Sequence, residues 1–208
     1  IDLIRMLFGH KSYKMTLKYI ARNPFLVSSV ADAMIVHYAD AFMSIISSVE
    51  KGSYSGEAAD NIAKIINGKQ TLFKGKLLRI SVFNYISHLI KAGDPIFIQR
   101  TSLGAYCVSS DNYTATSLPP CLQGHKHDET FTPNPKRCDV GCKNAVFIGE
   151  AKESLERDIA FYEAALSQNN DHISTTNRRI FSKKIDDTIR HLNNICHNQN
   201  DIQFIPVR

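Results

Sequence analysis

The 208-residue sequence has no tryptophan and no run of eighteen or more apolar residues. Its most apolar stretch is interrupted by Asp32, His37 and Asp40. A transmembrane helix needs about 20 consecutive, mostly apolar residues, so the sequence predicts no membrane span. A secretory signal pattern is also absent. We therefore expect a cytoplasmic protein that has no membrane partner.

Acidic residues are missing from one part of the chain. Between Arg5 and Arg22 there are five basic residues and no acidic one, within a chain of 25 Lys and Arg against 20 Asp and Glu. The overall excess of +5 is mild and common among proteins, but it permits binding to phosphates. The local cluster would create a positive field suited to a DNA backbone. The alternative, a solvated helix face, is the commoner outcome for a run of charges.

The same part of the chain contains the segment from Gly9 to Tyr19, GHKSYKMTLKY. In it, His10 precedes Tyr19 by nine positions and Thr16 precedes it by three, and apolar residues lead up to Gly9. This pattern resembles the last catalytic motif of tyrosine recombinases, the phage-integrase family, which reads G-H-x-S-x-x-x-T-x-x-Y on a small helix. The alternative is an ordinary helical corner in which His10 and Tyr19 are structural, because motifs of this length also arise by chance.

The resemblance implies that Tyr19 is the nucleophile and that His10 contacts the scissile phosphate. A phenol has a pKa of about 10 and is a poor nucleophile at neutral pH, so cationic side chains must stabilise the charge of the transition state. In the family these include two arginines and a lysine, which would lie upstream of Ile1. We therefore expect a C-terminal fragment that does not cleave DNA alone. No metal or nucleotide is implied for catalysis.

The resemblance also implies partners and contacts. We expect double-stranded DNA as the partner and a homo-oligomer in the synaptic complex. Lys11, Lys14 and Lys18 are candidates for contacts to the DNA backbone, which position a protein without reading sequence. The rival hypothesis is a non-catalytic, zinc-containing DNA-binding or assembly module. Exposure of Tyr19 discriminates between the two, because a structural tyrosine would direct its hydroxyl at a buried partner.

Apolar periodicity predicts a mainly α fold. The expected elements are helices over 30–49, 57–67, 77–91, 144–166 and 173–195, and short strands over 96–101 and 105–109. We divide the chain into the helical end of a tyrosine-recombinase catalytic domain (1–50), a helical extension (51–95), a small β-hairpin and zinc-type loop region (96–143) and a C-terminal helical hairpin (144–208). The apolar stripe of the first helix indicates intramolecular core more than a contact with a neighbouring protomer.

Four of the five cysteines lie in the loop region with the spacing C-x13-C-x16-C-x3-C: Cys107, Cys121, Cys138 and Cys142. A long loop with few apolar residues needs a cross-link to hold its shape, and in a DNA-directed chain we expect thiols or metal ligands more than disulfides. Tetrahedral zinc on four thiolates would be a closed, structural site. His125 or His127 could replace one thiolate, and the alternative is four ordinary small residues.

The sequence around these cysteines also resembles the cysteine-containing tail of some large recombinases of mobile elements. Gly104 to Cys107, Pro120-Cys121 and Cys138 to Ala145, followed by a long charged helix, carry that resemblance. It implies that the four cysteines are the zinc ligands. Cys196 lies outside the cluster and is expected to be a core or surface thiol. The basic residues of the last helix could contact DNA, but a solvated helix face accounts for them more simply.

Overall fold

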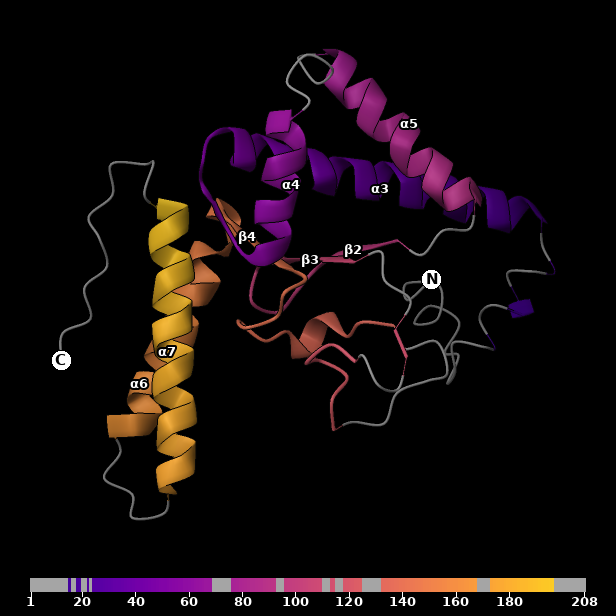
Figure 1. Cartoon of the computed structure of the whole chain (residues 1–208). Helices are drawn as coiled ribbons and strands as arrows, with labels where there is room; N and C mark the ends of the chain where they lie inside the picture. The colour runs from indigo at the N-terminus through magenta and orange to yellow at the C-terminus, as the bar shows by residue number, and fades with distance from the viewer. Residues whose placement is uncertain are drawn as a thin grey trace.

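A computed structural model of the chain describes residues 15, 18–19, 22, 24–68, 76–92, 96–109, 113–114, 118–124, 132–167 and 173–196. These residues form a mainly helical structure that also contains a four-stranded antiparallel sheet. The predicted fold class is thereby confirmed at the level of mainly α. Figure 1 shows the sheet between two groups of helices, with the pair α6 and α7 on one side and α3, α4 and α5 on the other.

The first group comprises α3 (Pro24–Glu50), α4 (Glu57–Gly68) and α5 (Lys76–Ala92). Helix α3 begins at a proline, whose fixed φ and missing N–H suit a first helical turn. It therefore starts earlier than the serines at which the sequence predicts its cap. Helices α4 and α5 both pack against α3, and Figure 1 shows α5 crossing it.

Helix α3 supplies most of the first hydrophobic core. Its buried positions follow helical spacing: Ile35, Tyr38, Ala39, Ala41, Ile45, Ile46 and Val49. They pack with Ile62 of α4 and Val82 and Ile86 of α5. The predicted intramolecular role of this apolar stripe is confirmed.

Within α3, Ser28–Glu50 is long and apolar enough to cross a membrane by length and composition alone. The sequence-based expectation that no stretch comes close was therefore wrong, because Asp32 and Asp40 are too few to exclude it. A third of the stretch is buried inside the protein. The core helix of a soluble protein passes the same criterion, so the finding is weak support for a membrane span.

The sheet has the strand order β1-β4-β3-β2. Its strands are β1 (Tyr54–Ser55), β2 (Phe97–Arg100), β3 (Tyr106–Ser109) and β4 (Ala145–Ile148). Strands β2 and β3 form the predicted hairpin, with Arg100 opposite Tyr106. Gly104 turns the chain between them at a φ of 71°, a value that glycine adopts without steric cost.

Strand β4 corrects the prediction of a helix that begins at Asn144. All four of its residues are buried, and the helix α6 (Lys152–Ser167) starts only after a short 3-10 turn, η2 (Gly149–Ala151). A short, continuous apolar run is compatible with a strand covered on both faces or with a buried helix. Here the strand is covered on both faces because Val146 and Ile148 belong to the first core, while Ala145 and Phe147 belong to a second one.

The second core lies under the helical hairpin formed by α6 and α7 (Thr175–Cys196). Leu155 and Ile159 of α6 and Leu192 and Ile195 of α7 are fully buried there. Figure 1 shows the two helices side by side, so the predicted C-terminal helical hairpin is confirmed. Helix α7 also contacts β1 and β4. The sheet thus takes strands from three of the predicted segments, 51–95, 96–143 and 144–208.

Candidate functional site

The predicted nucleophile, Tyr19, lies on an exposed helical turn. Lys18 and Tyr19 are helical and Arg22 follows in a turn, with the Arg22 N–H donating to the Tyr19 carbonyl at 3.3 Å. By helical spacing Met15, Lys18, Tyr19 and Arg22 share one face. All four are exposed, Tyr19 to 44%.

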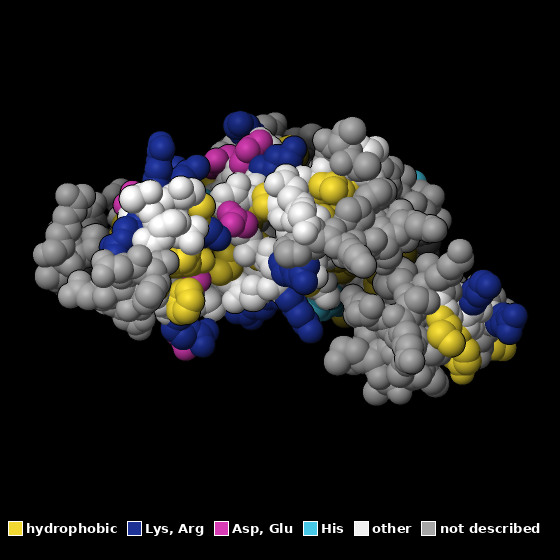
Figure 2. Space-filling view, turned by 90° about the horizontal axis from the view of Figure 1, so that it is seen from below, with side chains coloured by type: hydrophobic (Ala, Val, Ile, Leu, Met, Phe, Trp, Pro, Cys, Tyr) yellow, Lys and Arg dark blue, Asp and Glu magenta, His cyan; other side chains and the backbone are white. Residues whose placement is uncertain are grey.

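Two basic side chains therefore accompany Tyr19 on one exposed surface. Seen from below, the end of the molecule nearest the chain's first helical residues carries dark-blue and yellow side chains together, among residues drawn in grey (Figure 2). The predicted phosphate ligand His10 and the predicted backbone contacts Lys11 and Lys14 lie outside the described residues. Of the predicted site at this end, the structure places Tyr19 and Lys18.

The four cysteines of the loop region come from four separate pieces of backbone. Cys107 lies on β3, Cys121 lies in the turn at 120–124, Cys138 follows the 3-10 turn η1 (Pro135–Arg137), and Cys142 precedes β4. Three of them are buried and Cys138 is half-buried. The fold thus carries residues that are far apart in sequence into one region.

The thiols are close enough to influence each other's ionisation. Burial raises the pKa of Cys107 far above its ordinary value, and the charges of Cys142, Cys138 and Cys121 raise it further. Burial also raises the pKa of Cys138 to about 11, with Cys142 and Cys121 adding to the effect. All four predicted ligands therefore converge, which their spacing in the sequence did not require.

A compact turn positions two of these cysteines; we call residues 138–142 the cysteine turn. Within it the Cys142 N–H donates to the Asp139 carbonyl at 3.0 Å, and the Gly141 N–H donates to Asp139 Oδ1 at 2.9 Å. Such an Asx turn fixes the backbone without a regular ladder. The turn ends where the Ala145 N–H donates to the Cys142 carbonyl at 3.0 Å, at the first residue of β4.

Hydrogen-bond donors surround the sulfur atoms. The Asn134 N–H donates to Cys121 Sγ at 3.4 Å. Burial raises the pKa of Cys142, and the backbone N–H groups of Asn144 and Ala145 act in the opposite direction because they stabilise the thiolate. Three backbone N–H groups thus point at two sulfurs.

The Thr101 hydroxyl lies beside a third sulfur. Thr101 is buried, and among the described side chains its Oγ1 is a buried oxygen that lacks a partner of normal hydrogen-bonding geometry. It nonetheless lowers the pKa of Cys138 against the larger effect of burial. The geometry is too poor for a hydrogen bond to a neutral thiol, but the hydroxyl is near enough to favour the thiolate. A buried unpaired hydroxyl costs about 1–3 kcal/mol, so this position needs an explanation.

No group of three or more His, Cys, Asp or Glu side chains in the described part of the chain has its ligand atoms arranged as around a metal ion. The four sulfurs gather without closing into a cage. His125 and His127, the predicted replacements for one thiolate, lie outside the described residues.

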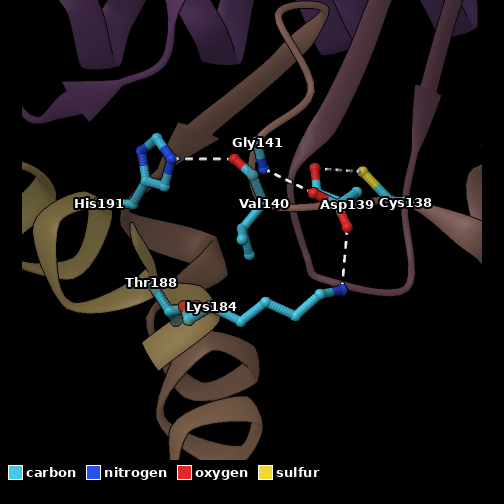
Figure 3. A network of polar contacts seen from close by, with 7 residues as sticks. All are labelled: Cys138, Asp139, Val140, Gly141, Lys184, Thr188 and His191. Atoms are coloured by element: carbon cyan, nitrogen blue, oxygen red, sulfur yellow. Dashed lines mark hydrogen bonds and ion pairs between the residues drawn. The ribbon is translucent and has the colours of Figure 1, made fainter. Parts of the chain in front are cut away.

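The cysteine turn is joined to helix α7 by two polar contacts (Figure 3). Lys184 Nζ lies 2.9 Å from Asp139 Oδ2, and His191 Nε2 lies 3.0 Å from the Val140 carbonyl oxygen. Burial alone would raise the pKa of Asp139, but hydrogen bonds from Lys184 and the Gly141 N–H outweigh it and the pKa is lowered. The sequence carries no signal for the pairing with Lys184, since the two residues are 45 positions apart.

His191 is a buried connector between the turn, the sheet and the helix. The Val140 carbonyl can only accept, so Nε2 carries the proton and Nδ1 accepts from the Ser55 hydroxyl at 2.8 Å. The Asn194 amide donates to that hydroxyl at 3.0 Å. The His191 ring also stacks on Phe147, with 4.3 Å between centroids.

The predicted basic edge of α7 divides into two groups. Lys184 and Arg190 form ion pairs with Asp139 and Asp187. Arg178, Arg179 and Lys183 are exposed. Lys184 therefore has a role inside the fold that its place in a charged run concealed.

Comparisons with protein-family models, with curated proteins and with solved structures found no match to this chain.

Proposed function

We propose that this chain is the C-terminal part of a tyrosine site-specific recombinase, in which Tyr19 attacks a DNA phosphate. The motif from Gly9 to Tyr19 carries the proposal. Its support from the fold is that Tyr19 is exposed and shares its helix face with Lys18 and Arg22. A purely structural tyrosine of this size would bury most of its ring.

The reaction needs a nucleophile, a charge-stabilising site and a leaving group. The Tyr19 oxygen forms a bond to phosphorus while the bond to the 5′-oxygen breaks, and the 5′-oxygen takes up a proton. The product is a 3′-phosphotyrosyl bond, which a second DNA strand can attack to rejoin. His10 would donate to a non-bridging oxygen or assist proton transfer, and the arginines that complete the site would be supplied upstream of Ile1.

The test is covalent trapping with the parent protein and a nicked suicide substrate, whose cleaved strand loses its 5′ end. The wild type is expected to form a protein–DNA adduct, and Tyr19→Phe is expected to form none while binding DNA unchanged, because only the attacking oxygen is removed. Tyr85→Phe is the matched control, since Tyr85 is also an exposed helical tyrosine. An adduct that persists in Tyr19→Phe would contradict the assignment.

The proposal includes the partners and the location expected from the sequence. Double-stranded DNA is the substrate, the synaptic complex is a homo-oligomer, and the protein works in the cytoplasm. Lys18 is exposed beside Tyr19 and would contact the DNA backbone. Replacing it should weaken binding evenly across DNA sequences.

A second candidate is a non-catalytic DNA-binding or assembly module that contains zinc. The observation that favours it is the convergence of Cys107, Cys121, Cys138 and Cys142 in the middle of the described fold. The trapping experiment separates the two candidates, because the second predicts DNA binding with no adduct in either the wild type or the Tyr19 variant.

A further inference from the structure

The cysteine cluster combines three features that ordinary buried thiols do not need. Its four members lie on separate pieces of backbone, hydrogen-bond donors point at their sulfurs, and one neighbouring hydroxyl is buried without a normal partner. A neutral thiol is a weak acceptor that gains little from such donors. A thiolate gains much more, because hydrogen bonds to a charged acceptor are roughly twice as strong.

Buried thiolates require a compensating positive charge. The burial of these side chains disfavours the charged form, and four negative sulfurs together would repel one another strongly. A thiophilic divalent cation removes both costs, and the donors then stabilise the residual charge of the sulfurs. The Thr101 hydroxyl, which has no normal partner while Cys138 is neutral, gains one when that sulfur becomes a metal-bound thiolate.

We propose that Cys107, Cys121, Cys138 and Cys142 bind one structural Zn²⁺ as four thiolates, and that Thr101 is a positioning residue that donates to Cys138. The proposal deepens the zinc-containing candidate function and is independent of DNA cleavage by Tyr19. Four thiols lose four protons as four Zn–S bonds form. The site then carries a formal charge of −2 and leaves no open position for water, as in other closed structural zinc sites.

The site has a defined mechanical consequence. It would join β3, the turn at 120–124 and the cysteine turn, and the cysteine turn is in turn held to α7 by Lys184 and His191. Closing the sulfurs around the ion requires a small contraction, because the four sulfurs do not form a closed ligand group in this structure. Loss of the metal is therefore expected to loosen the turn first and the seat of α7 next.

The first experiment measures metal in the intact chain, purified under reducing conditions. Elemental analysis is expected to find one zinc per chain. Cobalt(II) substitution should give the intense visible d–d bands of a tetrahedral ion and a near-ultraviolet sulfur-to-cobalt charge-transfer band of four-thiolate intensity. A chain that takes up no stoichiometric metal, or a charge-transfer band of three-thiolate intensity, would overturn the four-cysteine site.

The second experiment separates the metal site from general folding. Thr101→Val keeps every ligand and the approximate side-chain volume, and is expected to weaken zinc on the order of 10–100-fold in competition with a chromogenic chelator. Ser102→Ala, at an exposed neighbouring residue, and Cys196→Ser, outside the cluster, should bind zinc as the wild type does. Wild-type affinity in Thr101→Val would overturn the role of Thr101, and loss of zinc in Cys196→Ser would overturn the ligand set.

Discussion

Gly56 occupies a backbone position that no other residue can take without cost. Its φ is +113°, and a Cβ built there would lie 2.3 Å from the carbonyl oxygen of Ala145. This oxygen belongs to β4, which pairs with β1 one residue before Gly56. The close approach of the two backbones is therefore possible only without a side chain.

Gly56→Ala is predicted to destabilise the protein by roughly 2–4 kcal/mol, because backbone strain adds to a clash with rigid backbone. Gly124→Ala is the control, since Gly124 has a φ of +70° but nothing within 4 Å of the added Cβ. It should cost roughly 1–2 kcal/mol from conformation alone. Chemical denaturation of both variants checks the difference, and equal losses would contradict the clash.

His191 gives a prediction about pH. Burial lowers the pKa of His191 below its ordinary value of 6.5, against a smaller opposing effect of the Val140 carbonyl. Below pH 6.5 the unfolded chain binds this proton more readily than the folded chain, so the contribution of His191 to stability falls as the pH falls towards its folded pKa. Above pH 6.5 both states are neutral and the contribution is constant.

Nuclear magnetic resonance can test both the pKa and the tautomer of His191. We expect a ring that titrates below 6.5 and carries its proton on Nε2, since Val140 accepts there and Ser55 donates to Nδ1. His37, which is exposed on α3, serves as a reference histidine in the same sample. A proton on Nδ1 of His191, or titration above its ordinary value, would contradict the network.

The sequence predicts some of these residues and not others. The four cysteines could be proposed as one site because cysteine chemistry restricts what clustered thiols do. Thr101, Lys184 and His191 carry no such restriction, and their roles arise only when the fold brings α7 and β2–β3 to the cysteine turn. A lysine in a charged helical run is most often solvated, which is why its sequence context groups Lys184 with the basic edge.

At the scale of single elements, α3 illustrates what periodicity determines. Ile45 is fully buried at the centre of the first core, whereas Val36 of the same helix is exposed. Ile45→Ala is predicted to cost about 2–5 kcal/mol, and Val36→Ala about 0.5 kcal/mol or less. Thermal denaturation of the two variants checks this, and similar losses would show that the two faces of α3 had been assigned wrongly.

Strand β4 illustrates what periodicity leaves open. The run Ala145–Ile148 has neither the alternation of a half-exposed strand nor the length of a helix, so its structure depends on the partners that cover it. Those partners are β1 and β3 at its edges and a hydrophobic core on each face. None of these long-range contacts is visible in a local window, so the predicted helix extends backwards through the strand.

For the molecule as a whole, β4 joins two cores that would otherwise be separate. Val146 and Ile148 pack under α3, and Ala145 and Phe147 pack under the α6–α7 hairpin. Ser53 adds a link across the body, because its hydroxyl donates to the Ile195 carbonyl near the end of α7. The segments divided by sequence, 51–95, 96–143 and 144–208, are therefore interleaved in space.

This arrangement predicts cooperative unfolding of residues 54–196. Native-state hydrogen exchange should find the slowest amides in β4 and its neighbour β3, with similar opening free energies on both sides of the sheet. Phe147→Leu should lower the protection of α7 and α4 together, because Phe147 lies on the strand that joins the two cores. Loss of protection in α7 alone would show that the hairpin opens as an independent unit.

The central claim is that Tyr19 becomes covalently attached to DNA, and the most direct measurement is to locate the attachment. The trapped protein–DNA adduct of the parent is digested with a protease and a nuclease, and the modified peptide is sequenced by mass spectrometry. We predict a nucleotide remnant on Tyr19, linked through a 3′-phosphate. A remnant on another residue, such as Tyr13 in the same motif, would contradict the claim.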